Sequence, residues 1–245
     1  MEKYSKTVKI VGVDIDAVRD DIAEYLAGTN PKVTLEEYMG ETHIRVEATG
    51  VDETEAKKTG KPVVKDLKAR YGAMIYTTNE EETLEQTVVE LLARNSLTIS
   101  TAESCTGGLL SGRIINVPGA SDIIKIGIVT YSNRAKRKYL GVKKSTLEKY
   151  GAVSAETAKE MAKGILAETK ADVGLSTTGI AGPDGGTKDK PVGLVYIGCN
   201  VCGNVRTREL RLSGDRMQIR QRTVTEALNL LRLSLLEYFT ETKLK

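Results

Sequence analysis

From residue 98 onward, short runs of β-branched residues alternate with longer stretches whose apolar residues recur at helical spacing. Parallel strands need long crossover connections, and helices of this length supply them. This half of the chain is therefore expected to form a three-layer α/β/α domain with a mixed sheet. Strands are expected at residues 98–102, 124–130, 172–178, 193–200 and 204–211, the last two as a hairpin, and helices at 108–116, 133–140, 144–150, 154–169 and 215–238.

The first part of the chain has a different pattern, with the order β-α-β-β-α-β, which predicts a small α+β plait. Strands are expected at residues 7–11, 32–38, 42–48 and 74–77, and helices at 16–27 and 54–71. Asp52 and Glu55 have the spacing of a capping box, and so do Asn79 and Glu82. The second box would open a new helix that runs to Arg94. The expected domains are therefore 1–78 and 79–245.

Composition narrows the class of protein. The chain has 245 residues, no apolar run near the roughly 20 residues that span a bilayer, and no signal-peptide pattern at its N-terminus. Three cysteines argue against a disulfide framework and for a cytoplasmic location. The net charge is −3 over residues 1–80 and +6 over the remainder. That basic excess is either a solvated face or an attraction for an anionic ligand, and a small phosphate fits it better than a nucleic acid.

The segment 103–108 (ESCTGG) joins an expected strand to an expected helix. Side chains and backbone N–H groups can converge on a ligand at such a turn, which suits a nucleophile. Ser104 and Cys105 are both candidates. A cysteine nucleophile usually relies on a histidine, and the single histidine, His43, lies far away in the sequence. Another base must activate a serine here.

Two further segments end expected strands. One contains Lys136, which lies one turn into its helix if Asn133 is the cap, and a buried lysine can serve as the base of a Ser–Lys pair. The other is the glycine-rich loop at residues 179–186. Each could also be ordinary: a surface lysine and a flexible loop. All three segments, however, follow the carboxyl ends of strands, where open α/β sheets bind ligands.

Five segments resemble, in their order, the motifs of one family: residues 101–108, 130–133 with Lys136, 151–154, 179–186 and 213–216. Together they resemble the C-terminal domain of the competence/damage-inducible CinA family, the nicotinamide-nucleotide amidases. Residues 1–78 resemble the KH-like middle domain of full-length members. The resemblance does not extend to a nucleotide-pyrophosphatase-type domain, so activity on ADP-ribose is not expected.

The resemblance implies hydrolysis of the carboxamide of nicotinamide mononucleotide to nicotinate mononucleotide and ammonia, with no metal or cofactor. It implies Ser104 as nucleophile, Lys136 as base and Tyr131 as a hydrogen-bonding or proton-relaying partner. It also implies a homodimer and no membrane association. The remaining site residues would be Thr106, Gly107 and Gly108 around the oxyanion, Asn133, Thr178 and Gly179 near the substrate, and Arg216 and Arg220 on the phosphate. The two arginines, four apart near a helix N-terminus, suit a shared phosphate.

The competing hypothesis is a catalytically silent protein that binds nucleotides or nucleic acid. KH domains hold the nucleic-acid backbone through a Gly-x-x-Gly loop. Residues 1–78 contain no such loop and are net acidic. Nucleic-acid binding is therefore not expected, and a spacer or dimerisation role is the preferred hypothesis for this domain.

Overall fold

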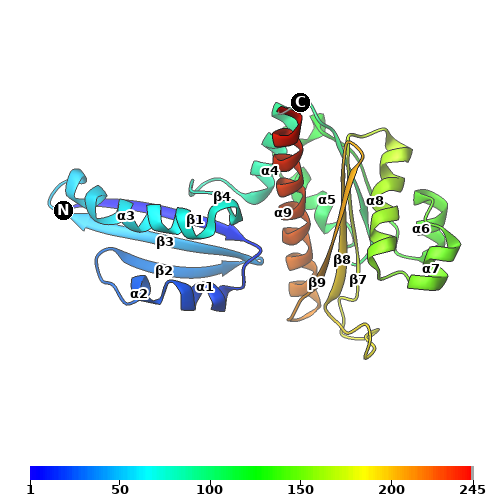
Figure 1. Cartoon of the computed structure of the whole chain (residues 1–245), viewed down its shortest axis with the longest axis horizontal. Coiled ribbons are helices and arrows are strands. Elements are labelled where there is room, and N and C mark those ends of the chain that lie inside the picture. Colours follow the sequence, from blue (N-terminus) through cyan, green and yellow to red (C-terminus); the bar gives the residue numbers. More distant parts are fainter. Residues whose placement is uncertain (244–245) are drawn as a thin grey trace. The chain divides into compact units, whose positions relative to one another are not determined.

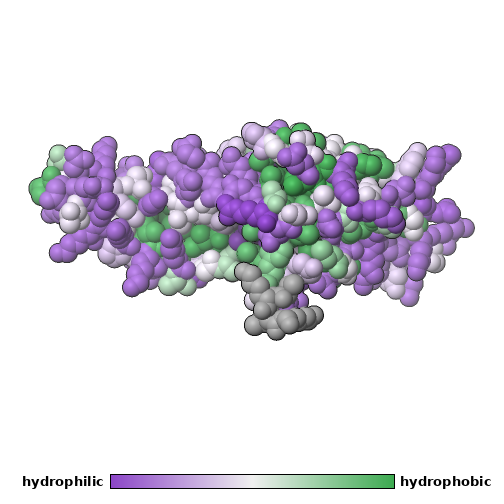
Figure 2. Space-filling model, turned by 90° about the horizontal axis from the view of Figure 1, so that it is seen from above, coloured by the Kyte–Doolittle hydropathy of each residue, from purple (hydrophilic) through white to green (hydrophobic). Residues whose placement is uncertain are grey.

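The structure, a computed structural model, describes residues 1–243 and divides into two compact units, Met1–Leu84 and Glu85–Lys245. The division falls six residues after the boundary expected from the sequence. In the view of Figure 2 the visible surface of both units is mainly hydrophilic, with hydrophobic patches between the polar side chains. None of the helices within residues 1–243 has the length and hydropathy needed to cross a bilayer.

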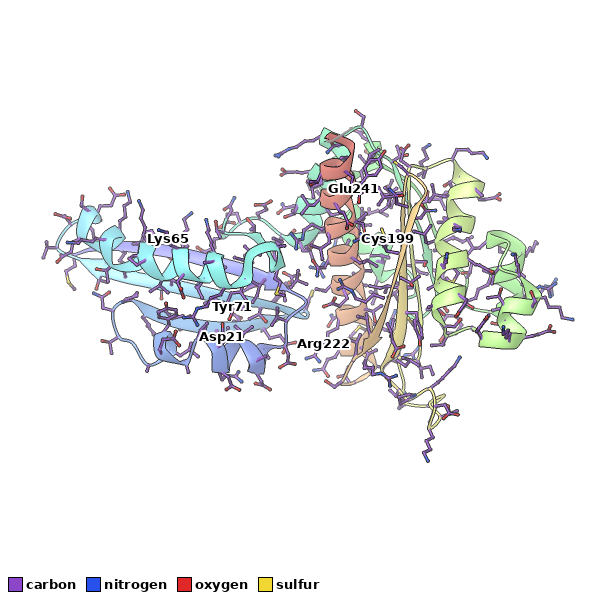
Figure 3. The ribbon with its side chains drawn as sticks, in the orientation of Figure 1. Asp21, Lys65, Tyr71, Cys199, Arg222 and Glu241 are labelled. Carbon is purple, nitrogen blue, oxygen red and sulfur yellow. The ribbon has the colours of Figure 1, made fainter. Side chains whose placement is uncertain are left out.

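Unit 1 is an α+β plait, as the order of its elements predicts. Its four strands form one antiparallel sheet in the order β2-β3-β1-β4. Tyr71 donates a hydrogen bond of 2.8 Å to Asp21, which joins the last residue of the long helix α3 to the last residue of the short helix α1 (Figure 3). The elements are β1 (Glu2–Val11), α1 (Ile15–Asp21), α2 (Ala23–Leu26), β2 (Lys32–Tyr38), β3 (Glu41–Gly50), α3 (Glu53–Tyr71) and β4 (Ile75–Thr77).

Two local predictions in this unit are wrong. The single helix expected at residues 16–27 breaks at Ile22, whose backbone leaves the helical region while its side chain is fully buried. The second capping box does not form either. Glu82 instead accepts from the Thr77 hydroxyl at 2.5 Å, and the Lys9 ammonium binds the carbonyls of residues 80 and 82. These contacts hold the segment in a bent, non-helical conformation, and the next helix begins only at Leu84.

Unit 2 has the predicted three layers around a mixed sheet, in the order β6-β5-β7-β8-β9. β5 pairs in parallel with β6 and β7, and the β8–β9 hairpin adds an antiparallel edge. Figure 1 shows α6, α7 and α8 on one face and α4, α5 and α9 on the other. The elements are α4 (Leu84–Arg94), β5 (Ile99–Glu103), α5 (Leu109–Ile115), β6 (Ile124–Val129), α6 (Asn133–Leu140), α7 (Lys144–Tyr150), α8 (Ala155–Thr169), β7 (Val173–Gly179), β8 (Leu194–Val201), β9 (Asn204–Arg211) and α9 (Arg216–Lys243).

The close packing of α6 on α8 depends on Gly164. A Cβ at this position would overlap the backbone carbonyl of Leu140, the last residue of α6. Leu140 is held in a core cluster with Met161 and Ile165 of α8, so the two helices cannot separate freely. We expect Gly164→Ala to lower the free energy of unfolding by about 2 kcal/mol, measured by denaturant titration.

Gly112 of α5 provides the matched control. A Cβ there meets no atom within 4 Å. Gly112→Ala should therefore raise stability by about 0.5–1 kcal/mol, because alanine favours the helix. Equal unfolding midpoints for the two variants would contradict the proposed overlap.

Candidate active site

The turn after β5 holds Ser104 at the carboxyl end of the sheet. The Ser104 N–H donates to the carbonyl of Thr177 in the neighbouring strand β7, at 3.0 Å. The hydroxyls of Thr106 and Thr177 lie 2.7 Å apart, both buried. Gly107 and Gly108 then take φ values of 57° and 97°, which glycine adopts without steric cost. This pair of glycines turns the chain into α5.

Glu103, the residue before Ser104, is fully buried and holds the far end of the turn. Its carboxylate accepts from the N–H groups of Gly108, Leu110 and Ser111 at 2.9–3.1 Å, and from the Ser111 hydroxyl. A carboxylate at this position also suits the positive end of the α5 dipole. Glu103 is therefore a capping residue of α5.

These contacts revise the oxyanion donors expected from the sequence. The Gly108 N–H is occupied by Glu103, and the Gly107 N–H donates to the Ser104 carbonyl at 3.2 Å. Neither glycine N–H points to free space, because the turn uses both to close itself. The Thr106 N–H instead interacts with the thiol of Cys105, which is a weaker acceptor than an oxygen. Thr106 is the one of the three that can supply a backbone donor.

Lys136 lies beside Ser104, as the shared sheet edge predicts. Its Nζ is 2.9 Å from Ser104 Oγ and 2.9 Å from the carbonyl oxygen of Thr130. The parallel pairing of β5 with β6 brings the two turns together, and the Thr130 N–H donates to the Glu103 carbonyl at 2.8 Å. A nucleophile and a candidate base are therefore within hydrogen-bond reach.

Burial lowers the pKa of the Lys136 amine. The side chain is 1% exposed, and no carboxylate among the ion pairs of residues 1–243 compensates its charge. Because burial disfavours the charged form, it lowers the pKa of Lys136 from its ordinary value of 10.5 to about 8. A substantial fraction of the amine is thus neutral near physiological pH and has a lone pair to accept a proton.

The cap of α6 differs from the expectation. Ser132, not Asn133, is the N-cap, and its hydroxyl accepts from the Ala135 N–H at 3.1 Å. Asn133 is the first helical residue and is exposed. Serine is among the preferred N-cap residues, so this signal was present in the sequence. Lys136 still lies one turn into the helix.

Tyr131 and Arg216 meet each other rather than the Ser104–Lys136 pair. Tyr131 is 64% exposed, and its hydroxyl accepts from Arg216 Nη2 at 3.4 Å. Within residues 1–243, no recorded hydrogen bond joins it to Ser104 or Lys136. Arg216 Nη1 donates to the Gly182 carbonyl at 2.5 Å. The first residue of α9 therefore links the turn after β6 to the glycine-rich loop.

Arg220 lies one turn further along α9 and contacts the turn that follows Ser104. Its Nε donates to the Cys105 carbonyl at 3.1 Å and its Nη2 to the Thr106 carbonyl at 2.8 Å. The side chain is half-buried, whereas Arg216 is exposed. The two arginines expected to share one ligand therefore make different contacts.

Thr178 and Gly179 end β7 and fix the glycine-rich loop. The Thr178 hydroxyl donates to the Ala152 carbonyl at 2.7 Å, and a Cβ at Gly179 would collide with Val195 of β8. Lys190 closes the other side of the loop, donating to the carbonyls of residues 150 and 153 at 2.6 and 2.7 Å. The loop is thus attached to the segment 151–154 at both of its ends.

Cys105, the alternative nucleophile, is buried and 5% exposed. Burial raises the pKa of its thiol to about 12, although Lys136 and the N–H groups of Cys105 and Thr106 oppose the rise. The thiolate is the reactive form of cysteine. Very little thiolate therefore exists at neutral pH, and the environment favours Ser104 over Cys105.

Two supporting residues were not singled out as site residues from the sequence: Ser132 and Thr177. Thr177 precedes the candidate Thr178 in the same strand, and its position across from Ser104 depends on strand register. No local pattern signals such a register. A helix N-cap such as Ser132, by contrast, is a local feature that the residue type predicts.

The comparisons with known proteins cover most of both units. The CinA C-terminal domain matches residues 81–235 and the damage-inducible protein CinA KH domain matches residues 5–77. A relative from Clostridium novyi, provisionally named a competence-damage inducible protein, is 49% identical over 95% of this chain and 56% of its own length. A CinA-like protein from Kosmotoga olearia is 47% identical over 95% of this chain and 57% of its own length. The chain thus spans little more than half the length of these relatives.

Solved structures agree with the fold of the second unit. The competence/damage inducible protein CihA from Agrobacterium tumefaciens has a TM-score of 0.60 at 44% identity, covering 62% of this chain and 93% of that one. A CinA superfamily protein from Klebsiella pneumoniae has a TM-score of 0.61 at 34% identity, covering 63% and 96%. Five ordered motifs, two domain matches and these folds lead to one conclusion: the chain belongs to the CinA family of competence/damage-inducible proteins.

Proposed function

We propose that the chain is an amidohydrolase that converts nicotinamide mononucleotide to nicotinate mononucleotide and ammonia through an acyl-enzyme on Ser104. The observation that carries the proposal is the 2.9 Å contact between Ser104 Oγ and the buried amine of Lys136. Ser–Lys pairs are a recognised variant of the serine hydrolase triad. The proposed substrate rests on the family resemblance, and the proposed mechanism rests on the contact between Ser104 and Lys136.

In the first half of the reaction, the neutral amine of Lys136 accepts the Ser104 hydroxyl proton as Oγ attacks the carboxamide carbon. The Thr130 carbonyl keeps Nζ aimed at Ser104. Negative charge develops on the amide oxygen, and the Thr106 N–H is the proposed donor to it. Lys136 then gives the proton to the leaving nitrogen, the C–N bond breaks and ammonia departs.

The second half repeats the same steps with water. Lys136 is neutral again after protonating ammonia, so it can take a proton from a water molecule that attacks the ester carbon. Collapse of the intermediate breaks the bond to Ser104 Oγ, and Lys136 returns the proton to the serine. One water is consumed, and the products are a carboxylic acid and ammonia.

Arg216 is the proposed phosphate ligand. It is exposed, it is the first residue of α9, and free N–H groups at a helix N-terminus favour anions. Tyr131 contacts Arg216, and Asn133 follows two residues later as the exposed first residue of α6; both are proposed to lie near the bound nucleotide. The net charge of +6 beyond residue 80 acts in the same direction.

The test is ammonia release from nicotinamide mononucleotide and from nicotinamide riboside, which lacks the phosphate. We expect release from the nucleotide, with kcat/KM for the riboside at least about tenfold lower, because a charge-assisted hydrogen bond is lost. Equal kcat/KM values would contradict the phosphate role of Arg216. Binding of the nucleotide by calorimetry without any ammonia release would favour the silent nucleotide-binding alternative.

A further inference from the structure

The guanidinium of Arg220 is already bound to the protein. Its Nε and Nη2 donate to two consecutive carbonyls of the catalytic turn, those of Cys105 and Thr106. A cation that donates to two carbonyls makes charge-assisted hydrogen bonds, which are stronger than neutral ones. The planar fork of arginine fixes both acceptors in one geometry. Arg220 therefore acts on the backbone that follows Ser104.

Because a peptide group is planar, a contact that fixes its carbonyl also fixes the direction of its N–H. In a trans peptide the C=O and the following N–H point in opposite directions. Arg220 holds the Cys105 carbonyl, so it also sets the direction of the Thr106 N–H, away from the guanidinium. By the same geometry, its hold on the Thr106 carbonyl directs the Gly107 N–H, which donates to the Ser104 carbonyl at 3.2 Å.

The absence of a side chain at Gly107 allows the guanidinium of Arg220 to approach the turn. A Cβ on Gly107 would lie 3.2 Å from Arg220 Nη2, tighter than ordinary van der Waals contact. The φ of 57° at this residue is a second reason for glycine. Gly107 thus permits both the turn and the close approach of the guanidinium.

The other backbone groups of the turn are held independently. Thr177 accepts from the Ser104 N–H, and Glu103 accepts from the Gly108 N–H. With Arg220 on the two carbonyls, the Thr106 N–H is held by the thiol of Cys105, which is a weak acceptor. This is the donor that the proposed reaction needs.

We infer that Arg220 is a positioning residue for the catalytic turn and not a ligand of the substrate phosphate. It acts through the peptide between Cys105 and Thr106, whereas Arg216 binds the phosphate. The inference rests on the proposed acyl-enzyme at Ser104. Losing one aligned oxyanion donor, or displacing the reacting groups by about 1 Å, costs about 10²-fold in rate.

The experiment compares Arg220→Gln with the matched variant Arg216→Gln, on nicotinamide mononucleotide and nicotinamide riboside. For Arg220→Gln we expect kcat to fall about 10²-fold on both substrates, with the nucleotide-to-riboside ratio of kcat/KM unchanged from wild type. For Arg216→Gln we expect a higher KM for the nucleotide alone and a smaller ratio. Arg220→Lys keeps the charge but loses the fork, so its kcat should stay well below wild type.

If Arg220→Gln lowered the nucleotide-to-riboside ratio of kcat/KM while turnover of the riboside stayed at the wild-type rate, the inference would be overturned. An Arg220→Lys variant with wild-type kcat would overturn it as well. Labelling of Ser104 by a fluorophosphonate provides a readout that needs no nucleotide turnover, and it should be about 10²-fold slower in Arg220→Gln. If wild type labels rapidly but releases no ammonia, the proposed function fails while labelling still tests Arg220. Thermal unfolding checks each variant, and Arg220→Lys carries the test if Arg220→Gln does not fold.

Discussion

Ser104→Ala is expected to lower ammonia release from nicotinamide mononucleotide by at least about 10³-fold, because no acyl-enzyme can form without the hydroxyl. KM should change little, since Ser104 Oγ contributes to the transition state more than to binding. Steady-state ammonia assays measure the loss. Mass spectrometry of the quenched wild-type enzyme should detect the acyl adduct, and the variant should lack it.

Cys105→Ala is the matched control on the neighbouring residue. The buried thiol, with its pKa raised to about 12, is not expected to attack the substrate. The variant should therefore retain kcat within about threefold, apart from a small cavity effect. Full activity in Ser104→Ala together with loss in Cys105→Ala would assign the nucleophile to cysteine and refute the serine mechanism.

Lys136→Met is expected to lower kcat by at least about 10³-fold, because methionine fills the space of the lysine stem but cannot accept a proton. In the wild type, kcat/KM should rise as pH rises through about 8, since the base works only when neutral. The variant should lose this pH dependence along with the rate. A wild-type profile that is flat between pH 6 and pH 9 would contradict Lys136 as the base.

Stability gives an independent check on the same residue. The folded pKa of Lys136 lies below its ordinary value, so the unfolded chain binds more protons between pH 8 and pH 10.5. Across that window the free energy of unfolding should increase with pH. Lys136→Met should remove this increase, and at pH 7 it should not lower the unfolding temperature, because it removes a buried, unpaired cation.

The layers of both units and the antiparallel edge of the second sheet could be predicted from periodicity, because amphipathic helices and β-branched runs show which faces are buried. The bounds of α6 and α7 agree with the expected ranges. The predictions failed where a distant residue decides the local structure. Lys9 of β1 binds carbonyls more than 70 residues away and so prevents the capping box expected at Asn79.

The candidate site also has features that the sequence predicts and features that depend on distant residues. Topology alone puts Ser104 and Lys136 on one sheet edge, and the structure brings their polar atoms to 2.9 Å. The contacts of Arg220 could not be anticipated, because they join residues 114 and 115 positions apart and involve backbone carbonyls that carry no sequence signal. Helical spacing correctly indicates that two arginines face the same way, but it cannot show what each one meets.

The contacts of α9 with the turn after β5 also bear on when the site becomes competent during synthesis. A growing chain emerges from the ribosome N-terminus first and tends to fold in that order. Ser104, Lys136 and the parallel core of the sheet can assemble before the final helix exists. The two carbonyls of the turn find Arg220 only once α9 has been made and has packed. α9 thus completes the contacts of this turn, and a nascent chain that ends before α9 would carry Ser104 and Lys136 without the contacts of Arg220.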